Sequence, residues 1–211
     1  RDRNTTGAGL LVGRHMLAHL ATQLAAAHIP ANILCTIVSD TLATCEASSI
    51  MGDDELGPWR VLLAEQYASL SRWRDAAQAL QSITPHAARR IPQLSFAQLC
   101  VRVVELWLQD LPTHVAEAEQ AIKRANSAIL EERDNKALVH ELWSYHARVL
   151  AIQHRFMEAA ARYMDLPHAD MYAAVYAIIS PPSAQRTSML TRLAQRASAW
   201  PFTQTLHHAA E

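Results

Sequence analysis

Apolar residues recur at spacings of three and four along most of the chain, which is the pattern of amphipathic helices. The first such segment runs from Leu10 to Leu24, and Pro30 is expected to end it. A second helix over residues 32–45 is expected to return against the first, so that residues 10–45 form one helix pair. Residues 1–9 are polar and contain glycine, and we expect them to be frayed.

Small, acidic and turn-forming residues gather in residues 46–58, which we therefore interpret as a linker. Pro58 at its end is expected in the first turn of the next helix, where the missing N–H costs nothing. Residues 59–166 then hold three helix pairs, separated by proline-containing turns. Residues 167–211 hold terminal helices, one capped by Ser183 and the last starting at Pro201.

The three pairs share one pattern, in which a helix is followed by a short turn, a bulky apolar residue and an alanine-rich second helix. The bulky residues Trp73, Val115 and Phe156 lie roughly 40 residues apart, near the period of two-helix repeats. Glycine is scarce, and alanine and leucine favour helix almost everywhere. The sequence therefore predicts an all-α fold, a right-handed solenoid of TPR- or HEAT-like antiparallel helix pairs.

The repeated pattern also predicts which side chains pack the pairs together. Small residues let two helices approach closely, and a large side chain fills the gap beside them. A large residue in place of Ala77 should overpack this contact by roughly 1–3 kcal/mol. The expected packing anchors are Trp59, Tyr67, Trp73, Ala76, Ala77, Trp107, Val115, Phe156, Ala159, Ala160 and Tyr163.

Composition narrows the possible partners. Nineteen Lys and Arg residues against twenty Asp and Glu residues give a formal net charge of -1, which supplies no attraction toward nucleic acid or an anionic membrane. No apolar stretch approaches the roughly 20 residues of a membrane span. We expect neither nucleic acid nor a membrane as a partner. Because the chain starts at Arg1 without a methionine or an apolar leader, we expect it to begin inside a larger product.

Candidate catalytic and metal-binding residues are few, and each has a structural interpretation. His15 and His19 share a helical face but have no third ligand nearby, and the spacings of the other histidines do not converge on one point. Three cysteines without a Cys-x-x-Cys pair suit reduced structural thiols. The sequence therefore predicts no catalytic residue, no cofactor and no metal. The residues considered are His15, His19, Cys35, Cys45, Cys100, Glu131, Glu132, Asp134, His140, His146, His154, His207 and His208.

Four arginines around the first repeat suggest a basic patch, formed by Arg72, Arg74, Arg89 and Arg90. Such a patch is often simply solvated surface. Arginine is also favoured in interfaces with acidic partners. Both interpretations stay open, and we treat the patch as the candidate partner surface.

Three stretches of the sequence are more specific than the general repeat pattern. They read Leu63-Ala64-Glu65-Gln66-Tyr67 through Trp73-Arg74-Asp75-Ala76-Ala77-Gln78, Ala147-Arg148-Val149-Leu150 through Ala159-Ala160-Ala161-Arg162-Tyr163, and Ser183-Ala184-Gln185-Arg186-Thr187-Ser188-Met189-Leu190. These stretches resemble the subunit 4 family of the COP9 signalosome. Together with the middle repeat they cover roughly residues 59–193. Their order along the chain matches that of the family.

The resemblance implies a PCI-type scaffold, in which an N-terminal array of helix pairs is joined to a winged-helix module. We expect this chain to be the N-terminal part without that module. In the family, the helical arm contacts cullin–RING ubiquitin ligases while another subunit removes a ubiquitin-like modifier from the cullin (deneddylation). The implied partners are the other signalosome subunits and the cullin and RING subunits, in the cytoplasm and nucleus. The implied role is that of a non-catalytic scaffold.

Two alternatives remain open from the sequence. A related PCI scaffold subunit of the proteasome lid would use the same architecture in another assembly. A helical enzyme would need a cluster of polar side chains in a pocket, and stoichiometric zinc in the purified protein would favour it.

Overall fold

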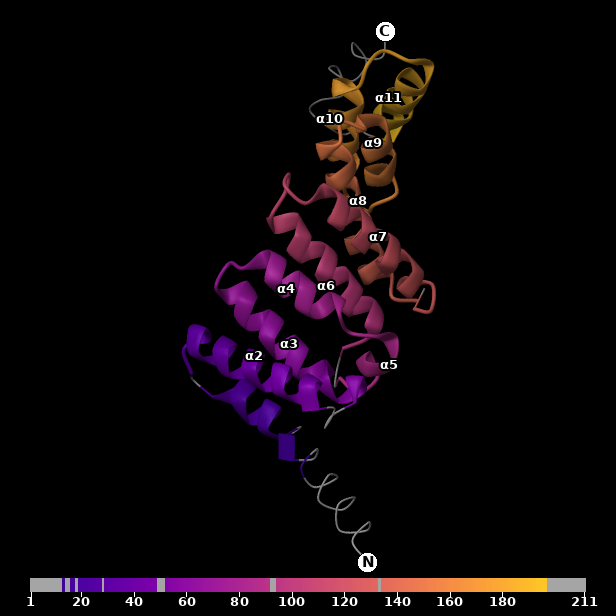
Figure 1. Cartoon of the computed structure of the whole chain (residues 1–211). Helices are drawn as coiled ribbons and strands as arrows, with labels where there is room; N and C mark the ends of the chain where they lie inside the picture. Colours follow the sequence, from indigo (N-terminus) through magenta and orange to yellow (C-terminus); the bar gives the residue numbers. More distant parts are fainter. Residues whose placement is uncertain are drawn as a thin grey trace, which may run out of the picture. The chain divides into compact units, whose positions relative to one another are not determined.

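The structure is a computed structural model that describes residues 13, 16–17, 19–27, 29–48, 52–91, 94–132 and 134–196. Every regular element in these ranges is helical, and the helices pack in neighbouring pairs (Figure 1). The predicted all-α repeat fold is thereby confirmed. The described residues divide between His114 and Val115 into two compact units.

The first unit stacks its helices in chain order. Helical residues 19–26 precede α2 (Ala31–Ser48), α3 (Asp53–Ser69), α4 (Trp73–Gln81), the single turn α5 (Pro85–Ala88) and α6 (Phe96–Gln109). The α3 helix contacts α2, α4 and α5, and α4 also contacts α6. Val38 and Trp59, which are 0% and 1% exposed, lie in the core between α2 and α3.

The second unit continues the same arrangement with α7 (Val115–Ile129), α8 (Lys136–Ile152), α9 (Phe156–Met164), α10 (Asp170–Ile179) and α11 (Ala184–Arg196). Each of these helices packs against the next one along the chain. Fully buried Leu190 and Leu193 of α11 complete a core with buried residues of α8, α9 and α10. The predicted second pair corresponds to α6 and α7, which belong to different units, so its pairing stays a prediction.

Most of the predicted linker over residues 46–58 is helical, which corrects the sequence interpretation. The α2 helix extends to Ser48, and α3 already starts at Asp53. The Glu55 carboxylate accepts a hydrogen bond of 3.0 Å from the backbone N–H of Gly52, which caps this early start. Pro58 is the sixth residue of α3, where its missing N–H removes one hydrogen bond of the helix, and α3 nevertheless continues to Ser69.

Side-chain caps explain several other helix starts. Ser95 and Gln98 form a capping box at α6, with hydrogen bonds of 3.1 and 2.8 Å. Ser183 accepts a hydrogen bond of 3.1 Å from the N–H of Arg186, which confirms the predicted cap of α11. The expected helix from Pro201 lies outside the described residues.

The short helix α5 was not predicted, because the sequence analysis expected only a proline-containing turn between two helix pairs at this place. Thr84 caps α5, and Pro85 occupies its first turn. A Cβ atom on Gly57 would lie 3.3 Å from the Ile91 side chain and 3.4 Å from the Ala87 carbonyl oxygen. Glycine therefore permits the close approach of α3 and α5.

Candidate interaction surfaces

Several of the predicted packing anchors occupy equivalent positions in the repeats. Trp73, Val115 and Phe156 are the first residues of α4, α7 and α9, and all three are half-buried, as is Tyr67. The alanines one turn later are almost completely buried, because two helix backbones meet there. The buried anchors are Trp59, Ala76, Ala77, Trp107, Ala159, Ala160 and Tyr163, and buried Ala118 holds the matching position in α7.

A turn with a fixed hydrogen-bond pattern joins α3 to α4. Ser71 has a φ of 57°, the left-handed conformation that follows many helix ends. The N–H of Ser71 donates to the Ala68 carbonyl (3.0 Å) and that of Arg72 donates to the Tyr67 carbonyl (2.8 Å), which together form a Schellman motif. Arg72 is thus both the residue after the turn and the N-cap of α4.

The Arg72 side chain closes this turn from outside. Its guanidinium lies 4.4 Å from the centre of the Tyr67 ring, and its Nε donates a hydrogen bond of 2.7 Å to the Asp75 carboxylate. The hydrogen bond to Asp75 is the main cause of a raised pKa at Arg72. The arginine therefore holds the end of α3 against the first turn of α4.

The turn between α8 and α9 has the same Schellman motif, followed by an arginine. His154 has a φ of 60°, and the N–H groups of His154 and Arg155 donate to the carbonyls of Ala151 (3.1 Å) and Leu150 (2.9 Å). The sequence analysis did not single out Arg155. Alignment of Arg72-x-x-Asp75 with Arg155-x-x-Glu158 within the repeat would have found it.

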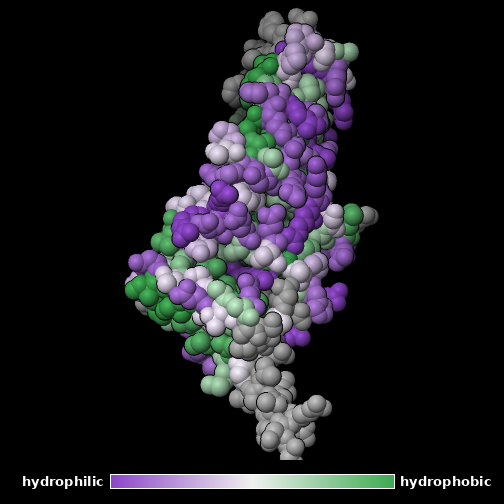
Figure 2. Space-filling view, in the orientation of Figure 1, coloured by the Kyte–Doolittle hydropathy of each residue, from purple (hydrophilic) through white to green (hydrophobic). Residues whose placement is uncertain are grey.

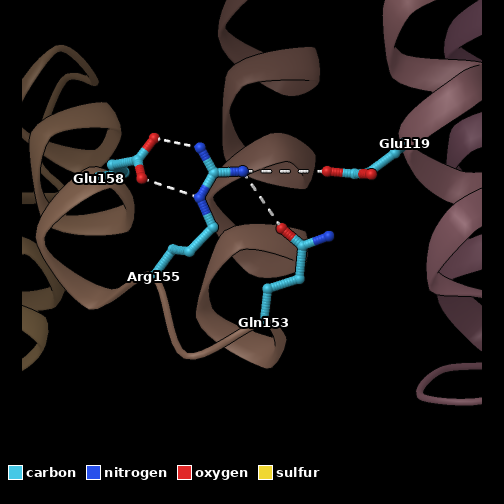
Figure 3. Close-up of polar contacts among 4 residues, drawn as sticks. All are labelled: Glu119, Gln153, Arg155 and Glu158. Carbon is cyan, nitrogen blue, oxygen red and sulfur yellow. Dashed lines mark hydrogen bonds and ion pairs between the residues drawn. The ribbon is translucent and has the colours of Figure 1, made fainter.

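Arg155 lies at the centre of a small polar network (Figure 3). Two of its nitrogens reach the two carboxylate oxygens of Glu158, with the Nε bond at 2.8 Å and the other at 2.5 Å. Its third nitrogen lies 3.4 Å from the Gln153 amide oxygen and 3.9 Å from a Glu119 carboxylate oxygen on α7. One guanidinium thus links α7 to the start of α9, and it lowers the pKa of Glu158.

The four predicted arginines do not form one patch. Arg72 lies over Tyr67, whereas Arg90 lies 3.7 Å from Glu55. Glu55 and Tyr67 are twelve residues apart on α3, which is about 18 Å along a helix. Because α3 and α4 are antiparallel, the two arginine pairs lie at opposite ends of the helix pair.

Only part of the predicted surface is free to meet a partner. Arg74 and Arg89 are exposed, and neither forms an ion pair with any residue that the structure describes. Arg72 and Arg90 already hold carboxylates of their own chain. Their part in partner binding stays a prediction, with Arg74 as the best-placed residue.

The other candidate residues are dispersed. Within the described ranges, no three His, Cys, Asp or Glu side chains gather into a group that could hold a metal ion. His140 packs on Trp143 and His154 on Phe156. Glu131 and Asp134 are exposed in the turn after α7. His19 is exposed, and His15, His207 and His208 lie outside the described residues.

The three cysteines are buried, and none forms a disulfide within the described residues. Burial raises the pKa of the Cys35 and Cys45 thiols, which keeps them protonated at neutral pH. Among the described residues, none of the helices combines the length and hydropathy needed to cross a bilayer.

Comparison with known proteins finds several relatives of one kind. No family model matches the chain. It is 29% identical over 199 residues to COP9 signalosome complex subunit 4 of Caenorhabditis elegans, covering 86% of this chain and 48% of that protein. The Arabidopsis thaliana subunit 4 is 27% identical over 73% of this chain and 38% of its own length. The Drosophila melanogaster subunit 4 is 24% identical over 87% and 47%.

These similarities confirm the resemblance that the repeats indicated. The chain spans about half the length, or less, of the curated relatives it matches.

Proposed function

We propose that this chain is part of a COP9 signalosome subunit of the subunit 4 type and serves there as a non-catalytic scaffold. The observation that carries the proposal is its similarity to subunit 4 of three organisms, over 73–87% of the chain. In this proposal the helical arm contacts a cullin–RING ubiquitin ligase while the assembled signalosome removes the ubiquitin-like modifier from the cullin. The other signalosome subunits are its stable partners, in the cytoplasm and nucleus.

The division between packing residues and exposed residues on the helices supports a binding role. Alanines and aromatic residues face neighbouring helices, and Ala76, Ala77, Ala159 and Ala160 are fully buried. Stacked helix pairs of this kind leave their outer surfaces as extended binding surfaces. Exposed polar residues between the packing positions are then the ones available to a partner.

The positive charge of Arg74 makes it a specific candidate for contact with a partner. Arg74 lies in the first turn of α4 with an exposed side chain and no ion pair within the described residues. An acidic group on a partner would meet it without displacing an existing carboxylate. Arg72 beside it, in contrast, would have to leave Asp75.

The nearest rival is a scaffold subunit of the proteasome lid with the same architecture. Capture with the tagged chain separates the two assemblies. The proposal predicts that purified signalosome subunits and a cullin–RING ligase are retained, and that lid subunits are not. Retention of lid subunits alone would contradict it. Stoichiometric zinc in the purified chain would instead favour a metal-dependent enzyme.

A further inference from the structure

Helix α10 is apolar around its whole circumference. After Asp170 its sequence is Met-Tyr-Ala-Ala-Val-Tyr-Ala-Ile-Ile, in which only the two tyrosine hydroxyls are polar. A helix that is hydrophobic on every side is normally covered on every side. Its neighbours α9 and α11 cover only one face of it, on which Ala173, Ala174 and Ala177 are buried.

The opposite face of α10 is exposed and carries no charge. Five large apolar side chains follow one another there at helical spacing, within roughly a third of the circumference. Figure 2 shows hydrophobic residues gathered over α10. We name these five residues the α10 apolar face: Met171, Tyr172, Val175, Ile178 and Ile179, which are 52%, 57%, 46%, 37% and 56% exposed.

The shape of this face suits a helix as its partner. Met171, Val175 and Ile179 follow one another at a spacing of four and form one ridge along α10, about 12 Å or two turns long. A ridge of this kind packs into the groove between side chains of another helix. A helix also offers no free strand edge, so a partner meets it through side chains alone.

A tyrosine pair joins the α10 apolar face to an arginine on α8. The Tyr172 ring stacks on the Tyr163 ring of α9, with the ring centres 5.4 Å apart. Burial is the main cause of a raised pKa at Tyr163, and the charge of Arg148 partly opposes it, so the Arg148 guanidinium lies near this tyrosine. Arg148 is exposed and forms no ion pair with any residue that the structure describes. Its positive charge is therefore available to a partner.

The chemistry of these residues indicates what the partner carries. Tyr, Met and Arg are enriched in protein interfaces, and Tyr and Arg often dominate the binding energy. An apolar face beside one unpaired cation is complementary to an apolar surface beside a carboxylate. A second copy of this chain would bring no such carboxylate on α10, because the only acidic residue of this helix, Asp170, already lies 3.4 Å from Arg196.

We propose that the α10 apolar face and Arg148 together bind an amphipathic helix of a partner protein. The apolar stripe of that helix packs along α10, and an Asp or Glu residue at the edge of the stripe pairs with Arg148. This surface lies in the second unit, whereas Arg74 belongs to the first. The proposal does not depend on which assembly the chain joins, so its failure would leave the proposed function standing.

Two synthetic peptides test this proposal with the complete chain. Both are about 18 residues long, or five helical turns, and carry the same leucine stripe at helical spacing. Glu residues flank the stripe in one peptide, and Lys residues flank it in the other. Fluorescence anisotropy should show saturable binding of the Glu peptide, at least about fivefold tighter than that of the Lys peptide. Arg148→Glu should reverse this preference, because it reverses the charge beside the apolar face.

A neutral substitution tests the apolar contact separately from the charge. Val175→Asn should weaken binding of the Glu peptide by about fivefold or more, because it places an amide in the centre of the α10 apolar face. Leu130→Asn is the matched control, since Leu130 is also exposed (58%) but comes after α7, and it should leave the affinity unchanged. Val175→Ser replaces Val175→Asn if that variant loses its helical circular dichroism.

Three results would overturn the proposal. They are the absence of saturable binding of either peptide, a preference that Arg148→Glu does not reverse, and equal affinities of wild type and Val175→Asn. Sedimentation that shows a dimer of the chain, lost in Val175→Asn, would also overturn it and would assign this face to a second copy.

Discussion

The substitution Ala77→Leu tests whether the alanine-rich helices set the spacing of the array. Ala77 is 0% exposed, and its helix α4 is packed between α3 and α6. Leucine adds three carbon atoms at a point without free space, and such overpacking costs roughly 1–3 kcal/mol. The free energy of unfolding should therefore fall by about 2 kcal/mol.

Urea unfolding followed by circular dichroism measures this loss. With a denaturant dependence of about 2 kcal/mol per molar, the midpoint should fall by about 1 M. Gln78→Leu is the matched control, because it adds an apolar side chain at the next, exposed position of the same helix. Its midpoint should move by less than about 0.3 M, equivalent to the usual limit of about 0.5 kcal/mol for surface substitutions. Equal midpoints for the two variants would refute the packing argument.

Three further predictions concern turns and charges. Ser71→Gly should raise the free energy of unfolding by about 0.5–1 kcal/mol, because glycine relieves the left-handed strain at φ 57° and loses only part of this gain to its greater backbone entropy. Thermal unfolding should therefore show a higher midpoint for Ser71→Gly and no gain for Ser71→Ala. Glu158→Gln should lose about 0.5 kcal/mol at pH 7, and this difference from wild type should vanish as the pH falls through the lowered pKa of Glu158. Burial, Arg162 and Arg155 lower the pKa of His146. Wild-type stability should therefore decrease as the pH falls below about 6.5, the ordinary pKa of histidine. Urea unfolding at about pH 7.5 and 5.5 should show a smaller decrease in stability for His146→Gln than for wild type.

Helix positions were largely predictable because local signals mark them. Prolines, capping serines and the alanine pattern placed the start of α9 at Phe156 and the cap of α11 at Ser183. The same local reasoning failed at two prolines. Pro85 follows α4, which ends at Gln81, and starts the unpredicted helix α5. Pro58 was expected near a helix start, although α3 begins five residues earlier.

Surface grouping was less predictable, because proximity in sequence does not give proximity in space. Arg72 and Arg90 are both near the first repeat in sequence, yet they contact opposite ends of α3. Arg155 was missed because single basic residues carry no signal until the repeats are aligned. The exposure of Met171, Val175 and Ile179 on α10 depends on the packing of neighbouring elements, which periodicity within α10 cannot reveal.

The central claim is that this helical array binds a cullin–RING ligase through exposed residues between the packing positions. Its most direct test is the affinity of the purified chain for a purified cullin–RING ligase, compared between wild type and Arg74→Glu. We predict saturable binding that weakens by about tenfold in the variant, as for loss of one charge-assisted contact of about 1.4 kcal/mol, with an unchanged thermal midpoint. Absence of saturable binding by wild type would contradict the claim.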